Sequence, residues 1–493
     1  MPRVALRGAM SAYEALVARV RRMTALRDAA EVLAWDQQVM MPTGGVEARA
    51  AQLAALSATM HEILVSSEFG RLLAEAEREE RDEARRAVLR ELRFFYDRET
   101  KVPGELVEAM SNAASRGYEA WVEAKAKSDY KAFRPHLERL LELKRKYASL
   151  VDPNVAPYEA LFQDYEPWIP LADARRNLTE LRAGLKPLVE KARARGAQRP
   201  AVLAGSWPAE KQEVVSKRVA ELIGYDFTRG RLDRSPHPFS AGGAHDARIT
   251  TRYYDHDPVP SILGTVHEAG HAMYMQGLPK EHMGTPLGDA RDLVVHESQS
   301  RLWENHVGRS LPFWERVLPM LREAFDGAPR ASAEEVWRAV NHVEPSFIRV
   351  DADELTYHMH IALRFELEEA MVAGKLSLDE LPHRWNETMQ RDLGITPPDD
   401  ARGCLQDMHW SSGSFGYFPT YSLGSMLSAQ LMDAYPGDPN DYPSLLQWLR
   451  DNVHRHGKRY KTGELIERAT GSALTPHAFL RYANEKYARV WAA

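Results

Sequence analysis

Hydrophobic residues recur at helical spacing over most of the chain. Near the N-terminus, four apolar side chains follow the i, i+3, i+4, i+7 pattern of one helix face: Tyr13, Leu16, Val17 and Val20. Further helices are predicted at residues 46–64, 80–98, 104–125, 129–150, 172–195 and 208–223. After an interruption that ends at about residue 260, the helical spacing of hydrophobic residues returns and continues to the C-terminus. Loops rich in Pro and Gly break it near 279–288, 396–403 and 435–443. The pattern predicts a mainly α-helical protein.

The texture changes between residues 226 and 256, where Gly, Pro, Ser and β-prone residues gather. The best strand run there extends from Ile249 to Tyr254. We therefore expect a small hairpin or sheet inserted in one large helical body with a deep groove. The chain shows no linker or internal repeat, so residues 1–493 are interpreted as a single domain, in which helices of about 1–200 can act as a lid over a catalytic part at about 226–425.

Composition and charge exclude several classes of protein. The chain has a formal net charge of −6, with 44% hydrophobic and 27% charged residues, which is typical of a soluble globular protein. Because Lys and Arg alternate with Asp and Glu, no basic surface for nucleic acid is expected. No run of about 18 apolar residues is present to span a membrane.

The N-terminal sequence and the number of cysteines bear on whether the protein is secreted or stays in the cytoplasm. Arg3 and Arg7 are followed by a charged amphipathic pattern instead of the apolar core of a secretory signal. Cys404 is the one cysteine of the chain, so no intrachain disulfide can form, and nothing marks this thiol as a nucleophile. We expect a cytoplasmic protein in which Cys404 is structural.

The motif that carries chemistry is His267-Glu268-Ala269-Gly270-His271. On a helix, residues four apart lie on the same face, so both imidazoles can reach one metal ion. Glu268, next to the first ligand, can accept a proton from a metal-bound water. The alternative interpretation is two partly exposed histidines on an ordinary helix, and a third ligand is needed to decide. Gly270 can permit the close approach of another element.

The third ligand is predicted in His296-Glu297-Ser298-Gln299-Ser300. Residues 292–307 have helical texture, and the preceding loop can return the chain antiparallel to the first helix. Glu297 would then complete a site of two histidines and one glutamate, with a fourth position open for water. Without that geometry Glu297 would be an ordinary surface glutamate. A metal site of this composition predicts hydrolysis by an activated water.

Several further blocks accompany the two metal motifs: Asp246–Thr250 (DARIT), residues 348–353 (IRVDAD), 403–410 (GCLQDMHW) and 409–421 (HWSSGSFGYFPTY). Together these blocks resemble the carboxypeptidase Taq family of metallopeptidases, and they span about residues 230–425. The resemblance implies a largely helical fold with a deep groove, related to those of angiotensin-converting enzyme and the oligopeptidases. It also implies a homodimer that removes C-terminal amino acids from peptides with broad specificity, proline being disfavoured.

The same resemblance assigns roles to individual residues. His267, His271 and Glu297 look like the metal ligands and Glu268 like the base. Arg349 looks like the residue that binds the free carboxylate of the substrate, and a guanidinium fork suits that task. The alternative for Arg349 is a surface ion pair with Asp351 or Asp353.

Two further groups are candidates for substrate contacts. His409, Tyr417 and Tyr421 would form the far wall of the site, where a hydroxyl or ring N–H can donate to the oxyanion, although aromatic residues in such a segment are also typical of a core. On the predicted hairpin, four residues are candidates for binding the substrate backbone as an added strand: His237, Asp246, Arg248 and Thr250. Asp246 and Arg248 can equally form an ion pair that shapes the loop.

We therefore predict a metal-dependent carboxypeptidase that acts on peptides with a free C-terminus. One divalent ion per chain is expected, with zinc as the default and cobalt or manganese as alternatives. An oligopeptidase or peptidyl-dipeptidase would share every metal residue, and a blocked C-terminus would distinguish it. A non-catalytic helical protein with a structural metal is a second alternative, but its closed site would need a fourth protein ligand.

Overall fold

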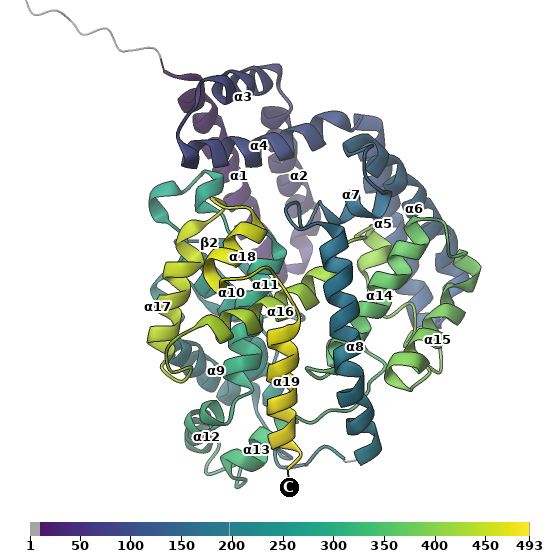
Figure 1. The fold of residues 1–493 in the computed structure, drawn as a ribbon, viewed down its shortest axis with the longest axis vertical. Coiled ribbons are helices and arrows are strands. Elements are labelled where there is room, and N and C mark those ends of the chain that lie inside the picture. The colour runs from purple at the N-terminus through teal and green to yellow at the C-terminus, as the bar shows by residue number, and fades with distance from the viewer. Residues whose placement is uncertain (1–9, 197, 493) are drawn as a thin grey trace, which may run out of the picture.

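Residues 10–196 and 198–492 are described by the computed structural model, and most of them are helical (Figure 1). The α-helices are α1 Ala12–Val39, α2 Val46–Leu64, α3 Ser67–Glu79, α4 Glu83–Lys101, α5 Gly104–Lys127, α6 Tyr130–Val151, α7 Pro157–Phe162, α8 Leu171–Arg195, α9 Ala209–Ile223, α10 Val259–Gln276, α11 Leu293–Arg301, α12 Leu311–Ala324, α13 Ala333–Val340, α14 Thr356–Val372, α15 Leu381–Leu393, α16 Pro419–Ala434, α17 Tyr442–Asn452, α18 Thr462–Thr470 and α19 His477–Val490. The mainly α-helical fold predicted from the hydrophobic pattern is confirmed. Arg3 and Arg7 lie outside the described residues.

The predicted helices of the N-terminal half agree with the structure to within three residues at their ends. Two helices, α3 and α7, were not predicted. Helix α3 begins at Ser66, whose hydroxyl accepts the backbone N–H of Phe69 at 3.2 Å, as an N-cap should. Its buried side chains are spaced i, i+3, i+4, i+7: Phe69, Leu72, Leu73 and Ala76. The signal for α3 was therefore present in the sequence.

The segment 226–256 contains the predicted small sheet. It consists of β1 Leu232–Arg234, β2 Ser240–Gly243 and β3 Asp246–Thr251, in the order β1-β3-β2. Strands β2 and β3 form an antiparallel hairpin, whereas β1 pairs with β3 in parallel. The end of the predicted strand run was wrong, because Tyr253 and Tyr254 follow β3 outside the sheet. Strand β2 is an edge of the sheet, and it contacts both α1 and α10.

Apolar side chains collect in two separate clusters. The large cluster, which we call the main core, runs through the helices from α5 to α19. The second cluster, which we call the small core, is formed mainly by α1, α3 and α4, and Leu287 joins it from the loop after α10. Helix α2, by contrast, has no fully buried residue.

Helix α16 lies near the centre of the molecule and packs against α8, α19 and α11, and α11 packs in turn against α10 (Figure 1). Three contacts show that α10 and the segment from Arg291 to Glu304 run antiparallel, because residues 267, 271 and 274 meet residues 304, 296 and 291. This is the orientation expected from the sequence. None of the described helices has both the length and the apolar character needed to cross a membrane.

Candidate metal centre

Helix α10 is buried on every side except one. Of its residues, four are not fully buried: Pro260, Gly264, His267 and His271. Their spacing of four, three and four residues defines a single stripe along the helix. The rest of the helix is fixed in the main core, so the two histidines face the one direction that the packing leaves open.

The two imidazoles meet Glu297 of α11 across this stripe. The carboxylate oxygen Oε2 of Glu297 lies 3.8 Å from Nε2 of His267 and 3.4 Å from Nε2 of His271. In a tetrahedral zinc site with ligand distances of about 2.0–2.1 Å, the donor atoms are roughly 3.3 Å apart. The three side chains therefore fit one divalent ion in donor type and in spacing, and their ligand atoms all lie within 4.8 Å of one another.

The second nitrogen of each histidine is held by the protein. Nδ1 of His267 lies 2.9 Å from a carboxylate oxygen of Glu304, and Nδ1 of His271 lies 3.1 Å from the carbonyl oxygen of His296. Both contacts suit a protonated Nδ1, which leaves Nε2 with a free lone pair for a metal. Burial opposes protonation of His267, but the charges of Glu297 and Glu304 outweigh it and raise its pKa.

Arginine side chains neutralise the two carboxylates. Nε of Arg301 donates to Glu297 at 2.7 Å and its Nη1 donates to Glu304 at 3.2 Å. Arg309 adds a further contact to Glu304 at 3.3 Å. Although burial alone would raise it, the pKa of Glu297 is held far below its usual range by Arg301 and the two histidines. Glu297 is therefore ionised at neutral pH.

Glycine allows this close packing of helices. A Cβ atom on Gly270 would lie 2.7 Å from Cα of Ser300, and one on Gly424 would lie 2.7 Å from Cβ of Glu297. Helix α11 is thus in close contact with α10 at Gly270 and with α16 at Gly424. A larger residue at either position would displace α11, and Glu297 with it, relative to the histidines.

Glu268 lies in the same cavity as the three candidate ligands and is almost completely buried. Burial raises the pKa of its carboxyl group, and the nearby charge of Glu297 adds to this, whereas the two histidines and the hydroxyl of Ser240 oppose it. A carboxylate with a raised pKa is a better proton acceptor than an exposed one. Its environment therefore suits a general base.

Arg349 is buried instead of forming a surface pair with Asp351 or Asp353. It lies in a short 3-10 helix, Arg349–Asp351, and its Nε and Nη2 donate to Oδ1 of Asp407 at 3.0 and 2.8 Å. Its Nη1 donates to the hydroxyl of Tyr357 at 3.1 Å. Oδ2 of Asp407 accepts a hydrogen bond from Arg364 at 2.6 Å. Two guanidinium groups thus share one carboxylate, so the group formed by Arg349, Asp407 and Arg364 carries a net positive charge.

These groups surround a single cavity of about 570 Å³, which we call the metal cavity. It is lined by residues from β2 and the segment before it, α10, α11, α14 and α16. The metal-ligand candidates, Glu268 and Arg349 all face it. The cavity therefore combines a metal site, a buried carboxylate and the guanidinium of Arg349.

Comparison with known proteins agrees with this arrangement. The family model described as "Carboxypeptidase Taq (M32) metallopeptidase" matches residues 15–487. The chain belongs to the carboxypeptidase Taq family. Thermostable carboxypeptidase 1 of Thermus thermophilus is 40% identical, over 98% of this chain and 99% of the relative, and carboxypeptidase 1 of Bacillus subtilis is 36% identical, over 96% and 97%.

Solved structures give the same result. The M32 carboxypeptidase of Deinococcus radiodurans superposes with a TM-score of 0.94 at 38% identity, covering 98% of this chain and 100% of that one. The carboxypeptidase of Pyrococcus furiosus superposes with a TM-score of 0.93 at 37% identity, covering 97% and 99%. The predicted family and enzyme class are confirmed: this protein is a metallocarboxypeptidase. Membership in a metallopeptidase family implies a divalent metal ion.

In this carboxypeptidase, the aromatic candidates lie in two different environments. Tyr417 and Tyr421 line the metal cavity, with ring centroids 5.2 Å apart. His409 is not among the residues lining that cavity and packs against Tyr417 and Phe418. Its Nδ1 has no hydrogen-bond partner among the described residues, and burial lowers its pKa to about 4.

The four candidates on the hairpin segment also lie in different environments. His237 lines the metal cavity, whereas Asp246 and Arg248 line a different pocket farther along the hairpin. They form an ion pair at 2.7 Å, which is the alternative considered for them. Thr250 is fully buried, and its hydroxyl bonds Ser235 at 2.7 Å.

Several residues of the carboxypeptidase site were not anticipated. Arg301 follows Glu297 by four residues in α11, so helical spacing was a usable signal for it. Glu304 lies in the π-helical segment Leu302–Gly308, where α-helical spacing no longer applies. Asp407 was present in the block GCLQDMHW but received no role. Tyr357, which contacts Arg349 and lies under the guanidinium of Arg301 at 4.7 Å, stands in no motif and could be found only from the fold.

Proposed function

We propose that this enzyme releases C-terminal amino acids from peptides with broad specificity, with His267, His271 and Glu297 as metal ligands. Glu268 is the proposed base and Arg349 the proposed anchor for the terminal carboxylate. A divalent ion bound there would supply Lewis-acid chemistry, which polarises a carbonyl and acidifies a water. Zinc suits two imidazoles and a carboxylate, and cobalt or manganese can use the same ligands.

In this proposal Glu268 transfers protons. Its carboxylate takes a proton from the attacking water and then donates that proton to the nitrogen of the leaving amino acid. The raised pKa of Glu268 supports both steps, because it brings the group closer to neutrality. Tyr417 or Tyr421 is proposed to donate to the oxyanion, since both hydroxyl-bearing rings line the metal cavity.

The observation that carries the exopeptidase assignment is the donor geometry of Arg349. A guanidinium has five N–H donors, and the protein contacts of Arg349 use three of them. Two remain for a substrate carboxylate, in a group that carries a net positive charge because Asp407 is shared with Arg364. Holding the terminal carboxylate there would set the last peptide bond over the metal ligands.

A double cycle tests this anchor. One short peptide is prepared with a free and with an amidated C-terminus, and kcat/KM is measured for wild type and Arg349→Ala. Each change should cost about 2–5 kcal/mol, and the two losses should not add, because each removes the same contact. Arg349→Lys should recover only part of the loss. Arg134→Ala, which removes a surface arginine paired with Asp379, is the matched control.

Additive losses would assign the carboxylate anchor to another residue. Efficient release from the amidated peptide by wild type would contradict the proposal and would favour an endopeptidase-like use of the same site. We also propose a cytoplasmic location, which agrees with a single cysteine, and a homodimer, which the family resemblance implies. Sedimentation of the full chain would decide the second point.

A further inference from the structure

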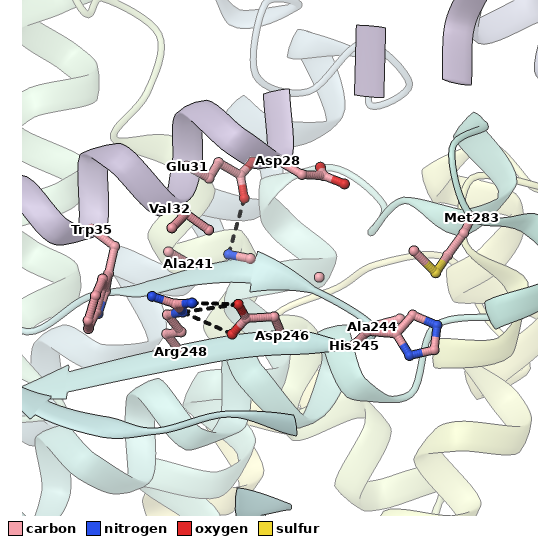
Figure 2. A pocket seen from close by; sticks show the side chains of 12 residues that line it. Asp28, Glu31, Val32, Trp35, Ala241, Ala244, His245, Asp246, Arg248 and Met283 are labelled. Atoms are coloured by element: carbon pink, nitrogen blue, oxygen red, sulfur yellow. Dashed lines mark hydrogen bonds and ion pairs between the residues drawn. The ribbon is translucent and has the colours of Figure 1, made fainter. Parts of the chain in front are cut away.

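A second pocket lies beside strand β2, between the β2–β3 hairpin and helix α1 (Figure 2). We call it the outer pocket. It has a volume of about 160 Å³, and its α1 side consists of Asp28, Glu31, Val32 and Trp35. Met283 approaches from the loop after α10, and the remaining lining is the hairpin from residue 241 to 248. Figure 2 shows the carboxylate of Glu31 reaching from α1 down to the backbone of β2.

Strand β2 connects the outer pocket with the metal cavity. Ser240, its first residue, lines the metal cavity, whereas Gly242 and Gly243 line the outer pocket. A strand advances about 3.3 Å per residue, so the pocket lies two to three residues, or roughly 10 Å, farther along the strand. Because β2 is a sheet edge, an extended peptide can pair with it and bring its own residues to the pocket in the same register.

We propose that the outer pocket is a subsite for a lysine or arginine side chain of the peptide substrate, located two or three residues before the scissile bond. This assignment rests on the proposed function, in which the last residue occupies the Arg349 side of the metal cavity. The preceding residues of the peptide then extend from the metal cavity along β2. The outer pocket is a recess that they reach at Gly242 and Gly243.

Charge supports a cationic occupant. Four carboxylates lie at the pocket and its rim, those of Asp28, Glu31, Asp246 and Asp289. They face two guanidinium groups and one ammonium group: Arg27 contacts Asp289 at 2.9 Å and Asp28 at 3.3 Å, Arg248 contacts Asp246 at 2.7 Å, and Lys458 lies at the rim. The carboxylates are in excess. Burial, with the neighbouring carboxylates, raises the pKa of Asp28 and of Glu31 despite Arg27.

The contacts of Glu31 are weak enough for a substrate to replace. Its Oε2 accepts the N–H of Gly242 at 3.1 Å, and its other oxygen lies 3.8 Å from Nε of Arg27. The N–H of Gly242 is a group that an added strand would use. A substrate carbonyl can take this N–H while the released carboxylate turns to the substrate cation.

The apolar part of the pocket suits the stem of a long side chain. Val32 and Met283 are 38% and 41% exposed and face the pocket without being covered. Trp35 is 4% exposed, and its indole N–H has no partner among the described residues. Arg248 lies over the same ring at 4.4 Å. Lysine and arginine place an apolar stem on such a surface and keep the charge at the carboxylates.

The test uses N-acetylated tetrapeptides ending in Ala-Ala-Leu or Ala-Leu, with lysine, norleucine or glutamate placed two or three residues before the scissile bond. Wild type should cleave the best lysine peptide with a kcat/KM about three- to tenfold above the norleucine peptide, and 0.5 M salt should reduce this ratio. The double variant Asp28→Asn, Glu31→Gln keeps the side-chain shapes and should bring the lysine-to-norleucine ratio of kcat/KM to about one. Glu62→Gln, an exposed glutamate of α2, is the matched control and should keep the ratio.

Charge exchange gives an independent measure. Glu31→Lys should favour the glutamate peptide over the lysine peptide by a similar factor. Equal rates for lysine and norleucine in wild type, or an unchanged lysine preference in the double variant, would overturn the subsite. If the norleucine peptide without its acetyl group showed the same gain as the acetylated lysine peptide, the side-chain assignment would be overturned. If no peptide loses its C-terminal leucine, the proposed function fails, and this result is distinct from the other outcomes.

Discussion

The helices that carry the candidate metal ligands and helix α1 use their charges differently. Around the metal cavity, the charged groups are buried and shared: the side chains of Arg301 and Glu304 are 15% and 12% exposed, and Arg364 is fully buried against Asp407. Along α1, Arg27 and Asp28 are 43% and 52% exposed. The apolar packing differs in the same way, since α10 is open on one stripe only, whereas α2 has no fully buried residue.

This difference in burial suits two different tasks, the fixing of a geometry for chemistry and the handling of a substrate. A buried charge that has lost its partner is costly, so the network around Glu297 holds each side chain in one geometry, as preorganised catalysis requires. Exposed pairs contribute little to stability, so the charges of α1 can change partners when a peptide arrives. We therefore expect substitutions near the metal to affect chemistry and metal binding, and substitutions in α1–α4 to affect substrate handling and local stability.

The largest effect is expected for Glu268→Gln. Because the amide cannot accept a proton, kcat/KM should fall by about 10²–10⁴-fold while the metal remains bound. Elemental analysis should then give about one ion per chain for Glu268→Gln and almost none for Glu297→Ala. Glu47→Gln, an exposed glutamate at the start of α2, is the control and should retain both. A near wild-type rate for Glu268→Gln would transfer the role of base to another residue.

Next in size is Leu73→Ala in the small core. Leu73 is completely buried there, and removing its side chain should cost about 2–5 kcal/mol. Hydrogen exchange should increase in α1, α3 and α4, with the metal content unchanged. Leu431→Ala, at a buried position of α16 in the main core, should instead lower the stability of the metal-bearing helices. Loss of metal from Leu73→Ala would show that the two regions unfold as one unit.

A smaller effect is expected when the carboxylate behind His267 is altered. Glu304→Gln removes the charge that orients the Nδ1–H of His267, and such changes typically weaken metal binding by about 10–100-fold. Competition with a chelator measures this affinity. Glu31→Gln makes the same chemical change in α1 and should leave the affinity unaltered. Equal affinities for both variants would mean that the cavity does not depend on Glu304.

The smallest effect is expected for the loss of folding stability at low pH. His454 is buried against Gln299 at 2.9 Å, and burial together with Arg450 lowers its pKa to about 3. In the unfolded chain a histidine takes up a proton near pH 6.5, which the folded protein resists. Its contribution to stability is therefore complete above about pH 6.5 and is lost as the pH falls toward 3. From pH 7 to 5.5 the loss should be about 1 kcal/mol.

Urea unfolding of wild type and of His454→Gln at both pH values measures the contribution of His454 to the free energy of unfolding. The variant should lose less stability than wild type on going to pH 5.5. Ser57→Ala, at an exposed position of α2, supplies the control, since it removes no titratable group and should leave the pH dependence as it is. An equal effect of the two substitutions would remove the distinction between the regions.

Sequence reasoning succeeded where the spacing of residues along a helix decides the outcome. His267 and His271 share a face because they are four residues apart, and that face is the one that the packing leaves open. It did not reveal that Glu304 supports His267, because a π-helical segment, Leu302–Gly308, follows α11. Such a segment changes the direction of the later side chains relative to an α-helix.

Contacts between distant segments could not be predicted in this way. Asp407 accepts hydrogen bonds from Arg349, which lies 58 residues earlier in the chain, and no local sequence pattern predicts that pair. The hairpin residue Arg248 was correctly assigned to the sheet, but the pocket that it lines is created by α1, more than 200 residues earlier. Motifs identified the chemistry, whereas tertiary packing determined which pocket each side chain faces.

The single cysteine lies beside the pair that fixes Arg349. Cys404 is 6% exposed, in the same loop as Gln406 and Asp407, and burial raises the pKa of its thiol. A thiol reagent therefore reacts only when this loop opens, because the thiolate is the reactive form. Since the chain has no other cysteine, the labelling rate of the natural protein, with no engineered reporter, measures how often the loop that holds Arg349 opens.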